Sequence, residues 1–330
     1  MRILLNAVSA KMGGAVRHLA PFRAALRAAF PDDTFLLAKP WEAGDPTYGA
    51  PLPTHPQTAF QRLKWDQYGV NVAAEGLRCD AILSLLNFGP VRHRVPHIVC
   101  ERNPQYFHPA YRHRPSLRRW LVRQVMRGAD RVIVPSAAMA NWILDAFPEF
   151  ERTTKLRVVH HGVDHSVFHP ALARYGNGDR REGTPIILGV GPRDPWRDLG
   201  TLEAACKDLP AILMVAENVP QDHMPDLYRV ATIFVFPSFC ESFGFPLVEA
   251  MASGLPVVAA DSALNREICG NAAVFFPVGD WATLRQQLKH LIRDTALQKD
   301  LEERSLKRSM DFSWTKCVSE VVAVVKEAIR

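Results

Sequence analysis

The sequence predicts an α/β protein built from two doubly wound domains, each with a parallel sheet between helices. The chain has 330 residues, which at about 150 residues per domain is enough for two. An apolar run at residues 2–6 leads through a glycine pair into a helical pattern, and another at 232–236 leads through a glycine loop into a second one. Strand, glycine-rich loop and helix in this order are typical of such domains.

Short apolar runs alternate with polar connections along the whole chain, and each run predicts a buried strand. The expected strands are 2–6, 34–38, 80–86, 97–100, 131–136, 156–159, 186–190, 211–215, 232–236 and 257–260. Helices are expected at about 15–29 and around Trp142, and an amphipathic helix closes the chain from Phe312 onward. Residues 39–60 are rich in Pro and Gly and predict an irregular connection, and 171–184 have the composition of a linker.

The composition indicates which partners and which cellular compartment to expect. The net charge is +6 and the pI is about 9.1, which favours acidic partners such as nucleotide phosphates, nucleic acid or anionic lipid. No apolar run approaches the ~20 residues that span a bilayer, and the apolar start is too short for a secretion signal. The six cysteines form no Cys-x-x-Cys pair, so we expect reduced core thiols in a cytoplasmic protein.

The most informative stretch is Glu241-Ser-Phe-Gly-Phe-Pro-Leu-Val-Glu249, in which seven residues separate two carboxylates. Gly244 permits close approach of the backbone to a ligand, and Pro246 suits the start of a helix that Gly254 ends. The free N–H groups and the positive dipole of such a helix start suit a phosphate. The alternative is that Glu249 caps the helix and Glu241 is a solvated loop acid.

This string, continued as Ala-Met-Ala-Ser-Gly-Leu-Pro-Val-Val, resembles the donor-binding signature of the family-four retaining glycosyltransferases. These are GT-B enzymes, with two Rossmann-like domains facing a cleft, and they use nucleotide sugars. The resemblance implies an acceptor-side domain at 1–168, a nucleotide-sugar-binding domain at 169–312 and a helix at 313–330 that crosses back onto the first domain. The phrase His160-His161-Gly162-Val163-Asp164 is similar to the hinge signature of that family.

The resemblance also implies a role for each residue of the donor site. Glu249 would hold the ribose hydroxyls, and Glu241 would lie beside the donor sugar as a catalytic residue. Arg193 and Arg197 match the family's two diphosphate-binding cations and would also be catalytic, by stabilising the charge that builds on the leaving diphosphate. An arginine in the place of the usual lysine adds a bidentate fork. The alternative for them is a solvated surface pair. The loop expected to line the donor site comprises Ser242, Phe243, Gly244 and Phe245.

On the acceptor side, Gly13 and Gly14 resemble the family's first glycine loop, which lies near the donor diphosphate and the acceptor. His18 stands where relatives often carry a basic residue, although it could equally be a histidine on a helix surface. Arg102 and Asn103 fall in a loop that faces the acceptor in the family. Other relatives carry a functional histidine where this chain has Glu101 and Arg102, so no histidine role is expected there.

The sequence departs from the family after the strand at 211–215. Only residues 216–226 precede Leu227-Tyr228-Arg229-Val230-Ala231, where relatives have a further helix and strand. The second domain is therefore expected to be trimmed, in a region that helps to recognise the nucleotide base in the family.

The stretch Arg112–Arg131 holds seven arginines and one acid, Asp130. Its apolar residues fall near helical spacing, which predicts a basic amphipathic helix resting on an anionic membrane. The alternative is an ordinary helix that buries its apolar stripe and solvates its arginines.

We therefore expect retaining transfer of a sugar from a nucleotide-diphosphate sugar to a glycan or lipid-linked acceptor. The expected setting is cell-surface polysaccharide biosynthesis, in the cytoplasm or peripherally on the inner face of the membrane. No metal is expected, since no strand-end loop carries Asp-x-Asp. No other cofactor and no nucleic acid are expected either. His160, His161 and His165 are the alternative metal ligands, but they lack acids or cysteines at the usual spacing.

Two other classes stay open. A nucleotide-sugar epimerase or a sugar phosphorylase would share the fold. A non-enzymatic basic binder of membrane or nucleic acid would explain the charge but not the Glu241–Glu249 string.

Overall fold

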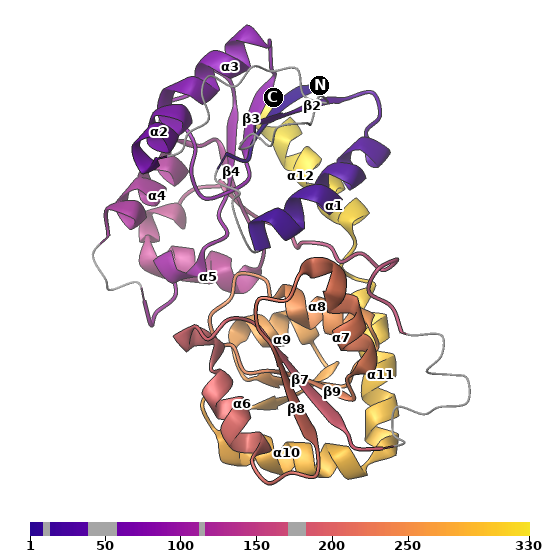
Figure 1. Cartoon of the computed structure of the whole chain (residues 1–330). Coiled ribbons are helices and arrows are strands. Elements are labelled where there is room, and N and C mark those ends of the chain that lie inside the picture. The colour runs from indigo at the N-terminus through magenta and orange to yellow at the C-terminus, as the bar shows by residue number, and fades with distance from the viewer. Residues whose placement is uncertain (9–13, 39–57, 112–115, 171–182) are drawn as a thin grey trace. The chain divides into compact units, whose positions relative to one another are not determined.

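The protein forms two compact units, each an α/β sandwich around a parallel sheet (Figure 1). The computed structural model describes residues 1–8, 14–38, 58–111, 116–170 and 183–330, and gives the backbone alone for 14–18. The N-terminal unit combines Met1–Gly162 with Trp314–Arg330, and the C-terminal unit is Val163–Ser313. The expected architecture of two Rossmann-like sheets is confirmed. The units divide at Gly162, where the sequence had suggested residue 168.

Among the described residues, the N-terminal sheet has six parallel strands in the order β2-β1-β3-β4-β5-β6. Leu4 of β1 pairs with Leu36 of β2 on one side and with Ile82 of β3 on the other. Every one of these strands was expected, with ends that differ by two residues at most. The strands are β1 Arg2–Asn6, β2 Thr34–Ala38, β3 Ala81–Ser84, β4 His97–Cys100, β5 Arg131–Val134 and β6 Leu156–Val158.

Both faces of this sheet are covered, which explains why its strands are continuous apolar runs. Successive side chains of a strand point to opposite faces. Ile3 and Leu5 of β1 pack in a cluster with Phe22 and Val318, whereas Leu4 packs with Val70 on the other face. The last helix lies against α1 in Figure 1. The helices of this unit are α1 Gly14–Ala29, α2 Ala59–Lys64, α3 Val70–Gly76, α4 Leu117–Gly128, α5 Ala137–Ala146 and α12 Trp314–Ile329.

The segment from α2 to α3 was not predicted. Thr58 and Gln61 form a capping box, in which each side chain accepts a hydrogen bond from the other residue's backbone at 3.1 Å. This start signal lies directly after the Pro- and Gly-rich stretch, which the sequence analysis extended to residue 60. A π-helical turn, Trp65–Gly69, then joins α2 to α3.

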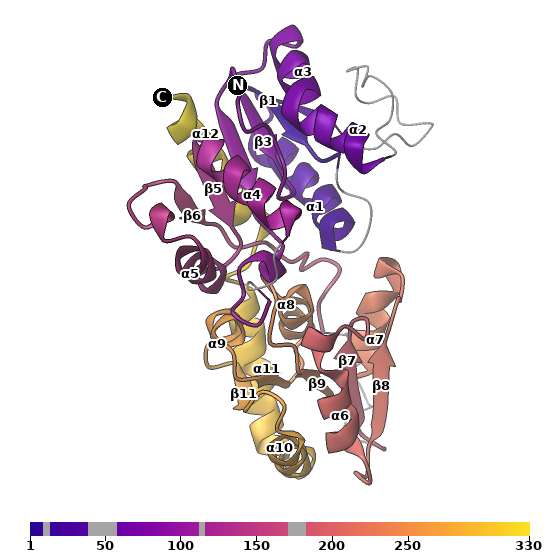
Figure 2. The ribbon, with the colours of Figure 1, turned by 90° about the vertical axis from the view of Figure 1, so that its left-hand side faces the viewer.

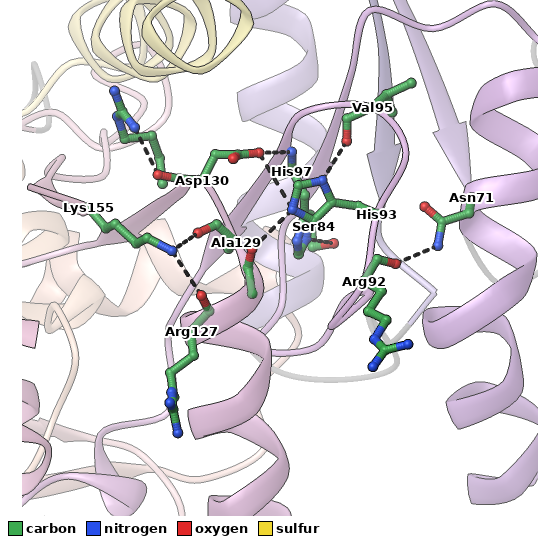
Figure 3. A network of polar contacts seen from close by, with 12 residues as sticks. Asn71, Ser84, Arg92, His93, Val95, His97, Arg127, Ala129, Asp130 and Lys155 are labelled. Atoms are coloured by element: carbon green, nitrogen blue, oxygen red, sulfur yellow. Dashed lines mark hydrogen bonds and ion pairs between the residues drawn. The ribbon is translucent and has the colours of Figure 1, made fainter. Parts of the chain in front are cut away.

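A network of polar contacts fixes the β3–β4 connection to the end of α4 (Figure 3). The two ring nitrogens of His93 contact the carbonyls of Val95 and Gly128, each at 3.0 Å. Lys155 donates to the Arg127 and Ala129 carbonyls at 2.8 and 2.7 Å. A cation on the last carbonyls of a helix satisfies acceptors that have no partner within the helix. The network therefore holds α4 and the neighbouring loop in register.

The C-terminal sheet has five parallel strands among the described residues, in the order β11-β10-β9-β7-β8. Between β8 and β9 the chain forms the short turn Gln221–His223 and one helix, α7. The strands are β7 Ile186–Val190, β8 Ile212–Ala216, β9 Ile233–Phe236, β10 Val257–Ala260 and β11 Ala273–Phe276. The helices are α6 Leu199–Cys206, α7 Met224–Val230, α8 Phe245–Ala252, α9 Ala263–Cys269, α10 Trp281–Arg293 and α11 Thr295–Ser309.

Successive side chains of β9 also point to opposite faces of the C-terminal sheet, and each face has its own core. Ile233 and Val235 pack with α6 and α10 residues such as Leu202 and Leu288. Phe234 instead contacts the ring of Tyr228 on α7, with ring centres 5.7 Å apart. Figure 2 shows α6 and α10 together in this unit, as their mutual contacts require.

The chain passes between the units twice, after Gly162 and after Ser313. Val163 bridges to Ser313, and its N–H donates to the Phe312 carbonyl at 3.1 Å. The two connections are therefore held side by side. Within the described residues, no helix is both long and apolar enough to cross a membrane.

Candidate functional site

The β9–α8 junction forms as a tight loop that ends at Gly244. This glycine is the N-cap of α8 with φ of +81°, a left-handed conformation that side chains disfavour. A Cβ added there would also lie 3.1 Å from Leu247 Cδ1. No acidic side chain occupies the first turn of α8. The positive end of the helix dipole at this loop favours a negatively charged group.

Glu249 lies inside α8 and is only 3% exposed. One of its oxygens accepts a hydrogen bond from the Tyr228 hydroxyl at 2.9 Å, and the other accepts from Gln221 Nε2 at 3.2 Å. Gly244 caps the helix, so the interpretation of Glu249 as the cap is wrong. A buried carboxylate requires such partners, and here they come from two separate elements.

Glu241 lies in the loop before Gly244 and pairs with Arg197. Arg197 Nη1 is 2.9 Å from Glu241 Oε1, and the side chains are 20% and 16% exposed. Ser238 Oγ lies 3.2 Å from the same carboxylate oxygen, and its one hydrogen is shared between this oxygen and the Trp196 carbonyl. Burial raises the pKa of Glu241, while Arg197 opposes the rise. Glu241 is therefore a partly buried, paired acid and not the solvated loop acid of the alternative.

Arg197 crosses the end of β7. A Cβ at Gly191, where φ is +135°, would lie 2.7 Å from Arg197 Cδ and 2.8 Å from Nη1. Only a glycine lets the guanidinium lie so close to the backbone. The Arg197 loop is also fastened to the Glu241 loop, because the Trp196 carbonyl accepts from Ser238 Oγ at 3.1 Å and from the Phe239 N–H at 3.0 Å.

Arg193 is directed elsewhere. It pairs with Glu203 at 2.7 Å and with Glu217 at 2.8 Å, and its side chain is 56% exposed. These acids raise the pKa of Arg193. The structure therefore brings Arg197 and Glu241 together but leaves Arg193 in a surface cluster of its own. Arg193 was expected at the donor diphosphate because of its position in the loop after β7. The sequence position does not give the direction in which its side chain points.

The junction has further members that the sequence analysis did not assign to the site. Besides Tyr228 and Gln221, the buried Asn265 donates to the Ser238 and Ala260 carbonyls at 2.9 and 2.8 Å. Asn265 lies in the first turn of α9, directly after β10. A helix starting at the carboxyl end of the next strand is the signal that could have pointed to it.

The loop residues differ in what they offer. Phe243 is buried, and its ring packs edge-on against those of Phe245 and Phe312, with ring centres 5.3 and 5.7 Å apart. Its side chain is thus part of the core. Ser242 and Phe245 are half-buried.

Arg102 and Asn103, which the sequence predicts to face the acceptor, follow β4. Asn87 Oδ1 accepts from their backbone N–H groups at 2.6 and 3.1 Å, and Asn103 Oδ1 accepts from the Gln105 N–H at 3.1 Å. Asn103 therefore caps the turn Pro104–Tyr106. Burial lowers the pKa of Arg102 to about 10.

Other expected acceptor residues cannot be placed as fully. Gly14 begins α1, and His18 lies in α1 with its backbone alone described. Gly13 lies outside the described residues.

Glu101, beside Arg102, is fully buried. Neither of its carboxylate oxygens has a hydrogen-bond partner in the described part of the chain. Burial raises its pKa well above the usual range, because burial disfavours the charged form. It lines a small cavity together with Arg102 and His161, and burial lowers the pKa of His161.

The basic helix is shorter than the stretch Arg112–Arg131. Arg119 lies 5.0 Å from the centre of the Phe147 ring, and Arg123 pairs with Glu149 at 2.7 Å. Arg131 pairs with Glu327 at 3.3 Å. These three arginines hold neighbouring elements, so they do not form one free basic face. Arg112 and Arg114 lie outside the described residues.

Comparison with protein-family models gives two matches. The model described as Glycosyltransferase Family 4 matches residues 12–167, and that of the glycosyl transferases group 1 matches residues 186–308. Between them the two models cover β2 to β6 of the first sheet and all five described strands of the second. The chain belongs to the family 4 glycosyltransferases.

This family 4 chain is similar in sequence to several curated proteins, among them the following two. It is 32% identical over 108 residues to the O-antigen chain mannosyltransferase B of Escherichia coli, covering 33% of this chain and 28% of the relative. It is 28% identical over 258 residues to the D-inositol 3-phosphate glycosyltransferase of Salinispora arenicola, covering 62% and 56%. The family 4 chain spans about half the length, or less, of the curated relatives that it matches.

Solved structures share the fold of this family 4 chain. The sucrose-phosphate synthase of Thermosynechococcus elongatus superposes with a TM-score of 0.75 at 16% identity, covering 99% of this chain and 98% of that one. HepE of Anabaena, solved with UDP-glucose, gives 0.71 at 17% identity and covers 99% and 100%. Likeness at such identity concerns the fold.

Proposed function

We propose that the protein is a retaining glycosyltransferase that moves a sugar from a nucleotide-diphosphate sugar to a glycan or lipid-linked acceptor in surface-polysaccharide biosynthesis. One observation carries the proposal. The stretch Glu241–Glu249, which resembles the family signature, forms the β9–α8 junction. There Glu241 forms an ion pair with Arg197, while Glu249 is buried and accepts hydrogen bonds from Tyr228 and Gln221. The two acids thus have different surroundings. The O-antigen mannosyltransferase among the relatives supports the proposed setting.

In this proposal Glu249 binds the ribose. Its two oxygens already accept hydrogen bonds from a hydroxyl and an amide, and a pair of ribose hydroxyls would make similar bonds. The loop amides up to Phe245 and the start of α8 would face the diphosphate. Tyr228 would keep the carboxylate oriented.

Arg197 stabilises the leaving group. The bond between the anomeric carbon and the diphosphate oxygen breaks, and its electron pair leaves with the diphosphate. The acceptor oxygen bonds to the same face of that carbon, and its proton passes to the departing phosphate. A partly buried guanidinium stabilises the growing negative charge more than water does. Glu241 would position the sugar and offset positive charge on it.

Arg193 and the acceptor residues stay predictions. Arg193 would have to leave Glu203 and Glu217 to reach a diphosphate, so we assign the main role to Arg197. Arg102 and Asn103 would contact the acceptor from the loop after β4. His18, Gly13 and Gly14 would complete that side.

We further propose that the enzyme works peripherally on the cytoplasmic face of a membrane. The support is α4, whose start exposes Leu117 and Trp120 beside Arg118. Aromatic and aliphatic groups next to cations suit an anionic lipid surface.

Transfer with retention is the direct test of the proposed function. Purified protein is incubated with labelled uridine- and guanosine-diphosphate sugars and a bacterial lipid-linked saccharide extract, and the product linkage is assigned by NMR. We expect an acceptor-dependent product with the anomeric configuration of the donor. An inverted product, or conversion of the donor without an acceptor, would contradict the proposal.

Transfer is also expected to need no divalent metal. Arg197 supplies the positive charge at the diphosphate that a metal ion would otherwise supply. The same assay run in excess chelator should keep its rate within about twofold, since RT ln 2 is only about 0.4 kcal/mol. A rate that collapses in chelator and returns with magnesium or manganese would refute this part of the account.

A further inference from the structure

The N-terminal unit carries a groove that the donor site does not use. It has a volume of about 510 Å³ and lies between α2 with its π-helical turn, the loop after β3, and α4. Sites for small ligands typically have volumes of about 300–1,000 Å³. The groove is therefore large enough for a ligand head group.

The floor of this groove lies at the carboxyl ends of strands. Asp66 lines it and accepts a hydrogen bond at 2.9 Å from Asn6, the last residue of β1. Asn87, also in the lining, follows β3 and holds the loop of Arg102. Open α/β sheets bind their ligands at this edge. Hydroxyl groups of a sugar would find hydrogen-bond acceptors here.

Two arginines face the groove from different helices, Arg62 of α2 and Arg118 of α4. Arg62 Nε is buried and has no hydrogen-bond partner among the described residues. Arg118 lies near the Tyr106 hydroxyl, in contrast to Arg123, which pairs with Glu149. A pair of guanidinium groups across a polar floor suits a phosphate or diphosphate group.

The rims of the groove are apolar and exposed. Leu63 on α2 and Leu117 on α4 line the groove and are 40% and 79% exposed, and Leu121 lines it as well. Next to them on the same helices, Phe60 and Trp120 are 75% and 56% exposed. The two helices lie beside each other in Figure 1. Large apolar side chains gathered on both sides of one groove indicate an apolar partner. Phosphate-binding arginines between apolar rims fit an anionic amphiphile.

We propose that this groove binds the phosphate head group of a lipid-linked acceptor, with Arg62 and Arg118 on the phosphate and the apolar rims in the lipid. The inference rests on the proposed function, because a transferase with this acceptor needs such a site. Asp66 would contact the saccharide.

The test uses farnesyl diphosphate as a short lipid diphosphate, titrated calorimetrically below its micelle concentration. Arg118→Glu and Arg62→Gln should each weaken its binding about tenfold or more, since hydrogen bonds to charged groups are strong. Arg127→Glu is the matched control, because it makes the same charge change at an exposed position of α4 outside the groove. That control should bind like the wild type.

Two further arms separate this inference from its alternatives. Inorganic pyrophosphate and farnesol should each bind at least tenfold more weakly than farnesyl diphosphate, because each lacks half of the recognised chemistry. Equal binding of pyrophosphate would indicate a plain anion site and overturn the proposal, as would equal losses in Arg118→Glu and Arg127→Glu. Uridine and guanosine diphosphate are titrated in parallel. If they bind normally while the groove variants leave farnesyl diphosphate unaffected, the groove assignment fails and the donor site stands.

Discussion

Arg197→Ala is expected to lower the transfer rate by on the order of a hundredfold or more, and to weaken binding of the nucleoside diphosphate about tenfold. The guanidinium is partly buried, so its effect on the growing diphosphate charge is large. The loss in rate should exceed the loss in binding, because the charge increases in the transition state. Steady-state transfer and calorimetry measure the two quantities.

Two other arginine variants serve as controls for Arg197→Ala. Arg304→Ala removes an exposed arginine of α11 that pairs with Asp300, and it should leave both quantities unchanged. Arg193→Ala should cost less than Arg197→Ala, because Arg193 is more exposed and is already paired with two acids. If Arg193→Ala proves the more damaging change, the two arginines have been assigned in the wrong order.

Glu249→Gln is expected to weaken binding of the bare nucleoside diphosphate by about one to two orders of magnitude. The glutamine keeps the shape but removes the charge, and a hydrogen bond to a charged group contributes roughly 1.5–3 kcal/mol. Tyr228→Phe serves as the control, since it deletes one internal hydrogen bond at Glu249 and leaves the carboxylate. Its effect on affinity should be several times smaller. Similar losses in both variants would mean that Glu249 acts through packing and not through the ribose.

The strands could be predicted because their information is local. Buried parallel strands need unbroken apolar runs, and runs such as Thr34–Ala38 and Val257–Ala260 have the same bounds in the structure. The β9–α8 junction was predictable for a similar reason, as its glycine and helix start lie within one short stretch. The segment from α2 to α3 was missed because one capping box follows a stretch dominated by Pro and Gly.

Side-chain partners could not be predicted, because they join residues far apart in the sequence. Glu249 meets Gln221 and Tyr228 from other elements. Arg193 and Arg197 are four positions apart in the sequence, but a turn at Pro195–Arg197 separates the directions of their side chains. Arg193 pairs with Glu203, whereas Arg197 pairs with Glu241. The arginines of α4 looked like a single basic face, but Arg123 is held by Glu149.

The central claim is that the β9–α8 junction binds the donor, with Glu249 on the nucleoside side and Glu241 on the sugar side. Calorimetric titration of bare uridine or guanosine diphosphate into the wild type, Glu241→Gln and Glu249→Gln tests it most directly. The account predicts that Glu249→Gln binds about ten to a hundred times more weakly, while Glu241→Gln binds at least as well as the wild type, because Arg197 loses a competing acid. An equal loss in both variants, or no loss in either, would contradict it.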